Sequence, residues 1–168
     1  MHKMWIEEEV NLDVLAAHIS DSGLDCTMQT DRIVLHSESG IAYQLILDEN
    51  RKFVRFMTFF PVAPHAAEKQ KRDFEHRLNM QVFMASFSVD DDNDLVVHYP
   101  LPYGHGLIAG QFMAVLHRFA SMLEFVIGTK NKDGLILFGS NTPQPEENDD
   151  NDPDPSRDPT DAVARLLN

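Results

Sequence analysis

The stretch from Leu78 to Val126 constrains the fold of this 168-residue chain more than any other part of it. An asparagine-bearing helix end, a β-hairpin with an acidic tip, a turn flanked by prolines and a long apolar helix follow one another without a break. The two hairpin strands, 82–89 and 95–101, are joined by five residues, whereas a parallel crossover needs about a dozen or more. We therefore expect an antiparallel hairpin, followed by a helix that packs flat across a sheet or against a second copy of itself.

The residues before this stretch predict one helix and a set of antiparallel strands. Asn11 suits a helix N-cap, and the apolar residues after it recur at helical spacing until Gly23. Strand-like runs follow at 26–30, 32–36, 41–47 and 53–60. The first two are one bent strand or two short strands around Asp31. Because their connections are short, these strands should pair as hairpins.

Two further helices are expected, a charged surface helix at 66–80 and a more apolar helix at 109–127 that ends at Gly128. The apolar face of the last helix consists of Phe112, Leu116, Phe119, Leu123 and Val126. Residues 135–138 are a candidate for a last short strand. The resulting order, α-β-β-β-α-β-β-α, predicts the α+β class, with a mainly antiparallel sheet and helices on one face or at its ends.

The composition divides the chain into one domain, residues 1–139, and a tail, residues 140–168. The tail holds five of the nine prolines, eight acidic residues, two basic residues and no aromatic residue. Such a segment cannot bury enough apolar surface to offset the entropy cost of ordering it, so we expect most of it to be disordered. Residues 160–167 are a candidate for a short helix. The tail is a solubilising brush, a cover for a groove of the same chain, or a motif that recruits a partner.

The net charge of the chain is −13, of which the tail contributes −6 (two basic minus eight acidic) and the domain −7 (twelve minus nineteen). An acidic domain repels phosphate backbones and anionic membranes, so we expect no nucleic-acid or membrane partner. A single cysteine, Cys26, excludes an internal disulfide and a CxxC metal site. The first ten residues lack the apolar region of a signal peptide, and no window approaches a membrane span. We therefore expect a cytoplasmic protein.

The acidic tip of the hairpin, Asp90–Asp94, is a candidate calcium site, because oxygens at alternate positions begin an EF-hand loop. However, Leu95 stands where that loop needs glycine, and Leu101 where it needs glutamate. A solvated hairpin turn is the favoured interpretation. The histidines show no i, i+4 pair, and the serines lie in no G-x-S-x-G elbow. We therefore expect no metal, no cofactor and no enzymatic activity.

The segment from Asn11 to Val126 resembles the YbjN family, whose members are regarded as bacterial sensory-transduction regulators. The similarity is sharpest in the hairpin FMASFSVDDDNDLVVHYPLPY and in the helix GLIAGQFMAVLHRFASMLEFV. It implies a fold like that of type III secretion chaperones, which are small acidic dimers that wrap an extended segment of a partner around their surface. The chain departs from the family pattern at Asn93-Asp94, where glycine is common. The family provides no catalytic residue to carry over.

Aromatic and methionine side chains are the remaining functional candidates, because they crowd both faces of the strand at 53–60. A domain with one sheet and three helices has few elements with which to cover two faces, so part of this surface should bind a partner. We predict a non-enzymatic adaptor or chaperone-like regulator, in bacterial signal transduction or stress response, that binds an extended protein segment and forms a homodimer. The alternative is a small-molecule sensor domain with a pocket between the sheet and the last helix. The predicted partner-binding or dimer surface consists of Phe53, Phe56, Phe59, Phe112, Leu116 and Phe119.

Overall fold

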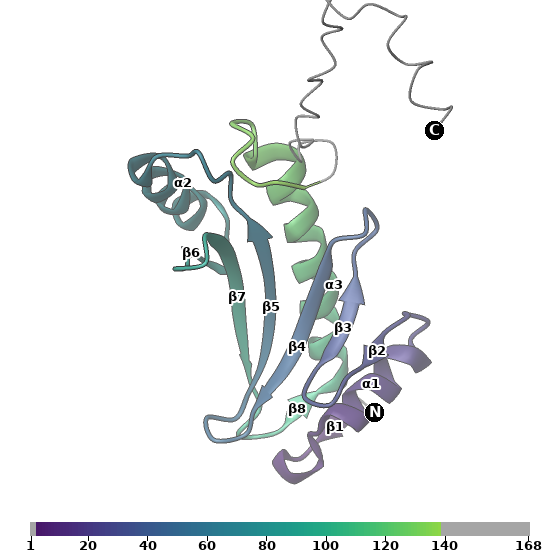
Figure 1. Cartoon of the computed structure of the whole chain (residues 1–168). Coiled ribbons are helices and arrows are strands. Elements are labelled where there is room, and N and C mark those ends of the chain that lie inside the picture. The colour runs from purple at the N-terminus through teal and green to yellow at the C-terminus, as the bar shows by residue number, and fades with distance from the viewer. Residues whose placement is uncertain (1–2, 139–168) are drawn as a thin grey trace, which may run out of the picture.

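A six-stranded antiparallel sheet in the order β2-β3-β4-β5-β7-β6 forms the centre of the computed structural model, which describes residues 3–138 (Figure 1). Its strands are β2 (Thr27–Met28), β3 (Ile33–His36), β4 (Ala42–Asp48), β5 (Phe53–Pro61), β6 (Ser86–Val89) and β7 (Asp94–Pro102). A separate two-stranded sheet pairs β1 (Met4–Trp5) with β8 (Leu107–Ile108). The predicted tail, with its candidate helix at 160–167, lies outside the described residues.

Helix α3 lies behind the sheet in Figure 1, α1 lies at the lower right beside β2, and α2 lies at the other end of the sheet beside β6. The helical segments are α1 (Leu12–Asp21), α2 (Glu68–Gln81), α3 (Ala109–Phe125), a 3₁₀ turn η1 (Glu7–Glu9) and a π-helical turn η2 (Val126–Lys130). The predicted class is confirmed: the described chain is α+β, with a mainly antiparallel sheet and helices on one face and at one end.

Local sequence signals explain where the first elements begin. The Asn11 side chain accepts a hydrogen bond from the Val14 N–H at 2.9 Å, as expected of an N-cap. The runs at 26–30 and 32–36 form two short strands rather than one bent strand. The chain reverses between them, where the Gln29 N–H donates to the Arg32 carbonyl at 2.8 Å.

The strand predicted at 82–89 is shorter in the structure and begins at Ser86. Val82 still belongs to the end of α2, because its N–H donates to the Leu78 carbonyl at 2.8 Å. Met84 then takes a φ of 97°, a left-handed conformation that interrupts an extended strand. The first half of the strand prediction was therefore wrong.

The C-terminal end of the described chain also differs from expectation. The last helix does not end at Gly128 but continues to Lys130 as the π-helical turn η2. Residues 135–138 form no full strand, although Ile136 makes an isolated antiparallel bridge with Val62. The Asn131 side chain braces this segment, since it donates to the Ile136 carbonyl and accepts from the Ile136 N–H, both at 2.8 Å.

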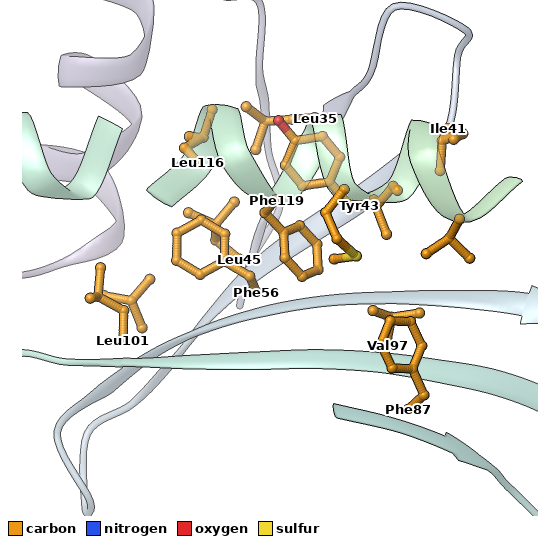
Figure 2. Packing of buried hydrophobic residues seen from close by; sticks show 14 of the residues in the cluster. Leu35, Ile41, Tyr43, Leu45, Phe56, Phe87, Val97, Leu101, Leu116 and Phe119 are labelled. Carbon is orange, nitrogen blue, oxygen red and sulfur yellow. The ribbon is translucent and has the colours of Figure 1, made fainter. Parts of the chain in front are cut away.

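The core lies between the sheet and helices α1 and α3 (Figure 2). Tyr43 and Leu45 of β4 point into it, as the predicted alternation of residues 41–47 requires. Phe56 of β5 meets α3 directly: the centre of its ring lies 5.6 Å from that of Phe119 and 6.1 Å from that of Phe112. The apolar face of α3 is thus covered by the sheet of the same chain.

Side chains of α2 cap the outer edge of the sheet at β6. Asn79 donates to the Phe87 carbonyl at 2.8 Å and accepts from the Phe87 N–H at 3.0 Å. The Glu75 carboxylate accepts from the Val89 N–H at 3.2 Å. Main-chain groups point alternately to the two sides of a strand, so Phe87 and Val89 are the residues of β6 that face away from β7. The helix therefore takes the place of a neighbouring strand.

Strand β7 continues beyond β6, and its open edge there carries two prolines. β6 reaches β7 only as far as the pair Ser86–His98, so Pro100 and Pro102 have a neighbouring strand on the β5 side alone. By the same alternation, their nitrogens face the open side, where a proline presents no N–H. The two prolines therefore lie at an edge of the sheet, where no neighbouring strand needs their missing N–H.

The small sheet fixes the N-terminus against α1 and α3. The turn that leads into β8 needs Gly106. This residue has a φ of 93°, and a Cβ added to it would lie 2.8 Å from the Trp5 carbonyl oxygen. Trp5 is held in the core by edge-on contacts with His18 and Phe112, with ring centres 5.1 and 6.3 Å away. Trp5 thus packs against both α1 and α3, whereas its neighbour Ile6 is 52 % exposed.

Candidate functional site

Four of the six residues predicted to form a partner-binding or dimer surface belong to the core of the single chain. The four that are fully buried between the sheet and α3 are Phe56, Phe112, Leu116 and Phe119. Their burial contradicts a role on the surface of the folded chain, because α3 lies across the sheet of its own chain and this sheet covers the apolar face of the helix. Phe53 and Phe59 lie on the opposite face of the sheet, where Phe53 is half-buried and Phe59 is 44 % exposed.

That opposite face of the sheet, which we call the open face, is not covered by a helix of the described chain (Figure 1). Apolar side chains from three adjacent strands meet there around a shallow hollow of about 190 Å³. We call these apolar residues the apolar stripe: Val34, Ala42, Met57 and Phe59. Met57 is only 9 % exposed, and the polar side chain of Gln44 also lines the hollow, between Val34 and Met57. An uncovered apolar strip on a sheet is a surface suited to binding another chain.

A second hollow of the open face, of about 260 Å³, lies at the start of β5 and contains two guanidinium groups. Arg51 and Arg55, which we call the arginine pair, line it together with Phe53, His98 and Pro100. No carboxylate of residues 3–138 forms an ion pair with either arginine. The open face thus joins an apolar part to a positively charged part on a chain that is otherwise acidic.

His98 is hydrogen-bonded to one member of the arginine pair, Arg55. Arg55 donates from Nε to Nε2 of His98 at 3.2 Å, which requires an unprotonated imidazole nitrogen. Burial, and secondly the charge of Arg55, lower the pKa of His98 from its ordinary value of 6.5.

The substitution His98→Gln is expected to make the free energy of unfolding less sensitive to acid. Because the folded chain holds a proton on His98 less tightly than the unfolded chain, the stability is complete above pH 6.5 and falls as the pH drops below it. Urea unfolding at about pH 7.5 and about pH 5.5 measures this difference, which spans the ordinary titration range of histidine. Ser86→Ala, which alters the cross-strand neighbour of His98, is the control and should keep the wild-type difference. If the His98→Gln variant kept the wild-type difference in unfolding free energy between the two pH values, the lowered pKa of His98 would be contradicted.

A third candidate surface lies at the edge of the sheet, on the helix-covered side. Phe83, in the loop between α2 and β6, is 94 % exposed. It borders a hollow of about 540 Å³ between β7 and α3, which we call the edge hollow. Its lining residues are Phe83, Met84, Tyr99, Val115, Arg118 and Met122. A phenylalanine this exposed is costly to leave in water, so the edge hollow is a candidate contact surface.

The acidic hairpin tip and the other possible metal ligands are the next candidates. No group of three or more His, Cys, Asp and Glu side chains there is arranged to hold a metal ion. The acidic residues at 90–94 form the hairpin turn between β6 and β7. The Asp90 carboxylate accepts from the N–H groups of Asp92 at 3.1 Å and Asp94 at 2.9 Å, so it is engaged by its own turn.

The segment Ala109–Lys130 is long and apolar enough, by length and composition, to cross a membrane. In the structure its apolar residues, such as Phe119 and Leu123, are buried against the sheet. The core helix of a globular domain has this composition when it is covered, so packing explains the apolar character of α3.

Residues 11–127 match the YbjN family, described as "Putative bacterial sensory transduction regulator". The chain belongs to the YbjN family. The match spans α1, the whole six-stranded sheet and α3, so it includes the open face and the edge hollow. No match was found among curated proteins.

Two solved structures have a similar fold. The crystal structure of YbjN from E. coli is 22 % identical, with a TM-score of 0.66, over 80 % of this chain and 99 % of that one. A chain of the HopA1–SchA chaperone–effector complex is 10 % identical, with a TM-score of 0.51, over 71 % of this chain and 91 % of that one. The predicted likeness to YbjN and to a type III secretion chaperone is confirmed at the level of the fold.

Two features of these surfaces were missed from the sequence. Phe83 was one of several aromatic residues in a presumed strand, and only the loop conformation at Met84 shows why it is exposed. The arginine pair was not singled out. The alternation of Phe53, Arg55, Met57 and Phe59 on one face of β5 was a signal that could have revealed it.

Proposed function

We propose that this protein is a non-enzymatic adaptor or chaperone-like regulator in the bacterial cytoplasm, which binds an extended segment of a protein partner on its open face and serves signal transduction or stress response. The observation that carries this proposal is the apolar stripe, which lies on a sheet face that no helix of the described chain covers. An extended segment can lie along such a face and place alternate side chains in its hollows.

The fold comparison supports a protein partner. The similar chain from the HopA1–SchA structure comes from a complex of a chaperone with an effector. By analogy, the same arrangement of sheet and helices here is suited to present a surface to another polypeptide. The charged residues at the rim of the open face would orient the partner more than they would tighten its binding.

We assign homodimer formation to the edge hollow rather than to the apolar face of α3, which is buried against the sheet. Phe83 and the hollow it borders are adjacent on one surface, so a two-fold axis could place the Phe83 ring of each copy in the hollow of the other. Arg118 at the same hollow would limit the orientations that fit. The apolar ring and the concave surface give the two halves of a self-complementary contact.

The substitution Phe59→Ser is expected to remove most of the bound partner, because it puts a polar group in the centre of the apolar stripe. Affinity purification from native cells, with quantitative mass spectrometry, compares the partners held by the variant and by the wild type. Phe125→Ser is the matched control, since both phenylalanines are 44 % exposed and Phe125 lies on α3, away from the open face. The control should keep the wild-type partners. Equal partner loss in both variants, or in neither, would remove the support for the open face.

The edge hollow also favours a second candidate function, a small-molecule sensor. Its volume of about 540 Å³ and its apolar wall with one arginine would suit a small anionic ligand. Unlike the predicted pocket, it opens at the rim of the sheet, since the space between the centre of the sheet and α3 is filled by side chains. Native mass spectrometry of the protein purified from native cells discriminates the two: a bound small molecule that is lost in Met122→Trp would favour the sensor.

A further inference from the structure

The arginine pair brings two positive charges together, and neither arginine forms an ion pair within residues 3–138. Four basic side chains of residues 3–138 form ion pairs with carboxylates, for example Arg77 with Asp133. Asp48 lines the same hollow, where one of its carboxylate oxygens accepts the main-chain N–H of Arg51 at 3.0 Å, so the hollow carries one negative charge against two guanidinium groups. Arg55 donates a hydrogen bond to His98 from Nε alone. The remaining guanidinium N–H groups of the pair are suited to bind carboxylates.

The chain itself carries a segment of matching charge. Residues 146–154 read EENDDNDPD and hold six carboxylates and no basic residue, whereas the seven residues before them, 139–145, are uncharged. The open face has the same order of properties. Starting from the Pro61 end of β5, the apolar stripe comes first, with Phe59, and the arginine pair follows.

The described chain ends at the correct end of the sheet for this match. The Leu137 N–H donates to the Pro61 carbonyl at 2.9 Å, so the described chain ends, at Phe138, beside the last residue of β5. The distance from Pro61 to Arg55, six residues along the strand, is about 20 Å at a rise of about 3.3 Å per residue.

The length of the segment fits that distance. An extended chain leaving Leu137 covers about 20 Å in roughly six residues. If roughly three or four more residues are used to pass around the end of the sheet, Glu146 and Glu147 come level with Arg55, at a reach of about 3.3 Å per residue. The next acidic residues, up to Asp152, then reach the hairpin that carries Arg51.

We propose that the acidic segment 146–154 of this chain lies on its own open face and pairs with Arg51 and Arg55, while the uncharged residues before it cross the apolar stripe. Because the segment is tethered, its effective concentration at the face is in the millimolar range, so a weak ionic contact suffices to populate it. The contact would compete with a protein partner for the open face. That regulatory meaning rests on the proposed function, whereas the contact itself does not.

Paramagnetic broadening in the full chain tests this contact. A nitroxide is attached at Asn148→Cys in a chain that also carries Cys26→Ser, so that the label has a single site. At low salt, we expect the amide signals of Arg55, Met57 and Phe59 to be broadened and those of α1 to be unaffected. Added salt should weaken the broadening, because the contact is ionic and partly exposed.

Charge reversal supplies the decisive comparison. The double variant Arg51→Glu and Arg55→Glu is expected to lose the broadening. Lys69→Glu with Arg72→Glu, on the exposed side of α2, changes the net charge by the same amount and should keep it.

A reversal on the tail side removes any doubt about folding of the β5 variant. Glu146→Lys with Glu147→Lys leaves every described residue unchanged and should also weaken the broadening. Combining the reversals on both sides should restore it, since the ion pairs are then formed with exchanged signs.

Three outcomes would overturn the proposal. They are broadening spread evenly over the surface, broadening that persists in the Arg51→Glu and Arg55→Glu variant, and broadening that passes between chains. The third is detected by mixing a nitroxide-labelled chain with a ¹⁵N-labelled chain without nitroxide, and it would assign the face to the tail of a second copy. No partner is present in these samples, so failure here leaves the Phe59→Ser test of the proposed function untouched.

Discussion

Replacing Phe112 by alanine is expected to lower the free energy of unfolding by about 3–5 kcal/mol, the range for truncating a buried phenylalanine. Phe112 is fully buried, and its ring lies 6.1 Å from that of Phe56 and 6.3 Å from that of Trp5. It therefore joins α3 to the sheet and to the N-terminal strand at one point. Since a domain is usually stable by only about 5–15 kcal/mol, the variant should be close to unfolding.

Urea unfolding followed by the fluorescence of Trp5, the single tryptophan of the chain, measures the effect. Phe59→Ala is the control, because Phe59 is 44 % exposed on the open face. It should cost about 1 kcal/mol, in keeping with the area it buries. Similar costs for the two variants would contradict the division between core and open face, and with it the correction of the predicted surface.

Replacing Phe83 by serine is expected to convert the proposed homodimer into a monomer. An aromatic residue at the centre of an interface commonly contributes about 2 kcal/mol or more. A two-fold dimer loses two such rings at once, so the loss is about 4 kcal/mol, which raises the dissociation constant about 1,000-fold. The folded monomer should keep its stability, because Phe83 is 94 % exposed within one chain.

Light scattering coupled to size-exclusion chromatography, over a dilution series, gives the mass of the wild type and the variant. Phe125→Ser again serves as the control, because it removes an exposed phenylalanine from the surface of α3 without touching the edge hollow. A wild-type chain that is monomeric at high concentration would refute the dimer. A Phe83→Ser variant that remains dimeric would place the interface elsewhere.

The order and type of the main elements could be predicted from the sequence because local signals specify them. Helix α1 follows from Asn11 and the apolar spacing behind it, and β4 from its strict alternation. The two-stranded sheet could not be predicted in this way. It joins Trp5 to Leu107, residues about a hundred positions apart, and two-residue strands carry no periodicity of their own.

The candidate surfaces were harder to predict because composition does not say which apolar residues a chain covers by itself. Phe59 and Phe119 look alike in the sequence, yet Phe59 lies on the open face, whereas Phe119 lies on the side of α3 that is buried against the sheet. The difference arises from which face of the sheet α3 crosses, a long-range choice. Met84 shows the same limit, since its positive φ exposes Phe83 in a segment that has the composition of a strand.

The contacts that α2 makes with β6 also govern how copies of this chain can join. A bare strand edge allows proteins to add to one another in an endless ribbon, the first step towards a fibril. Here Asn79 and Glu75 occupy the outward donors of β6, and Pro100 and Pro102 offer none further along. Growth by main-chain pairing is therefore blocked along this border, so copies of the chain can join there only through side-chain contacts.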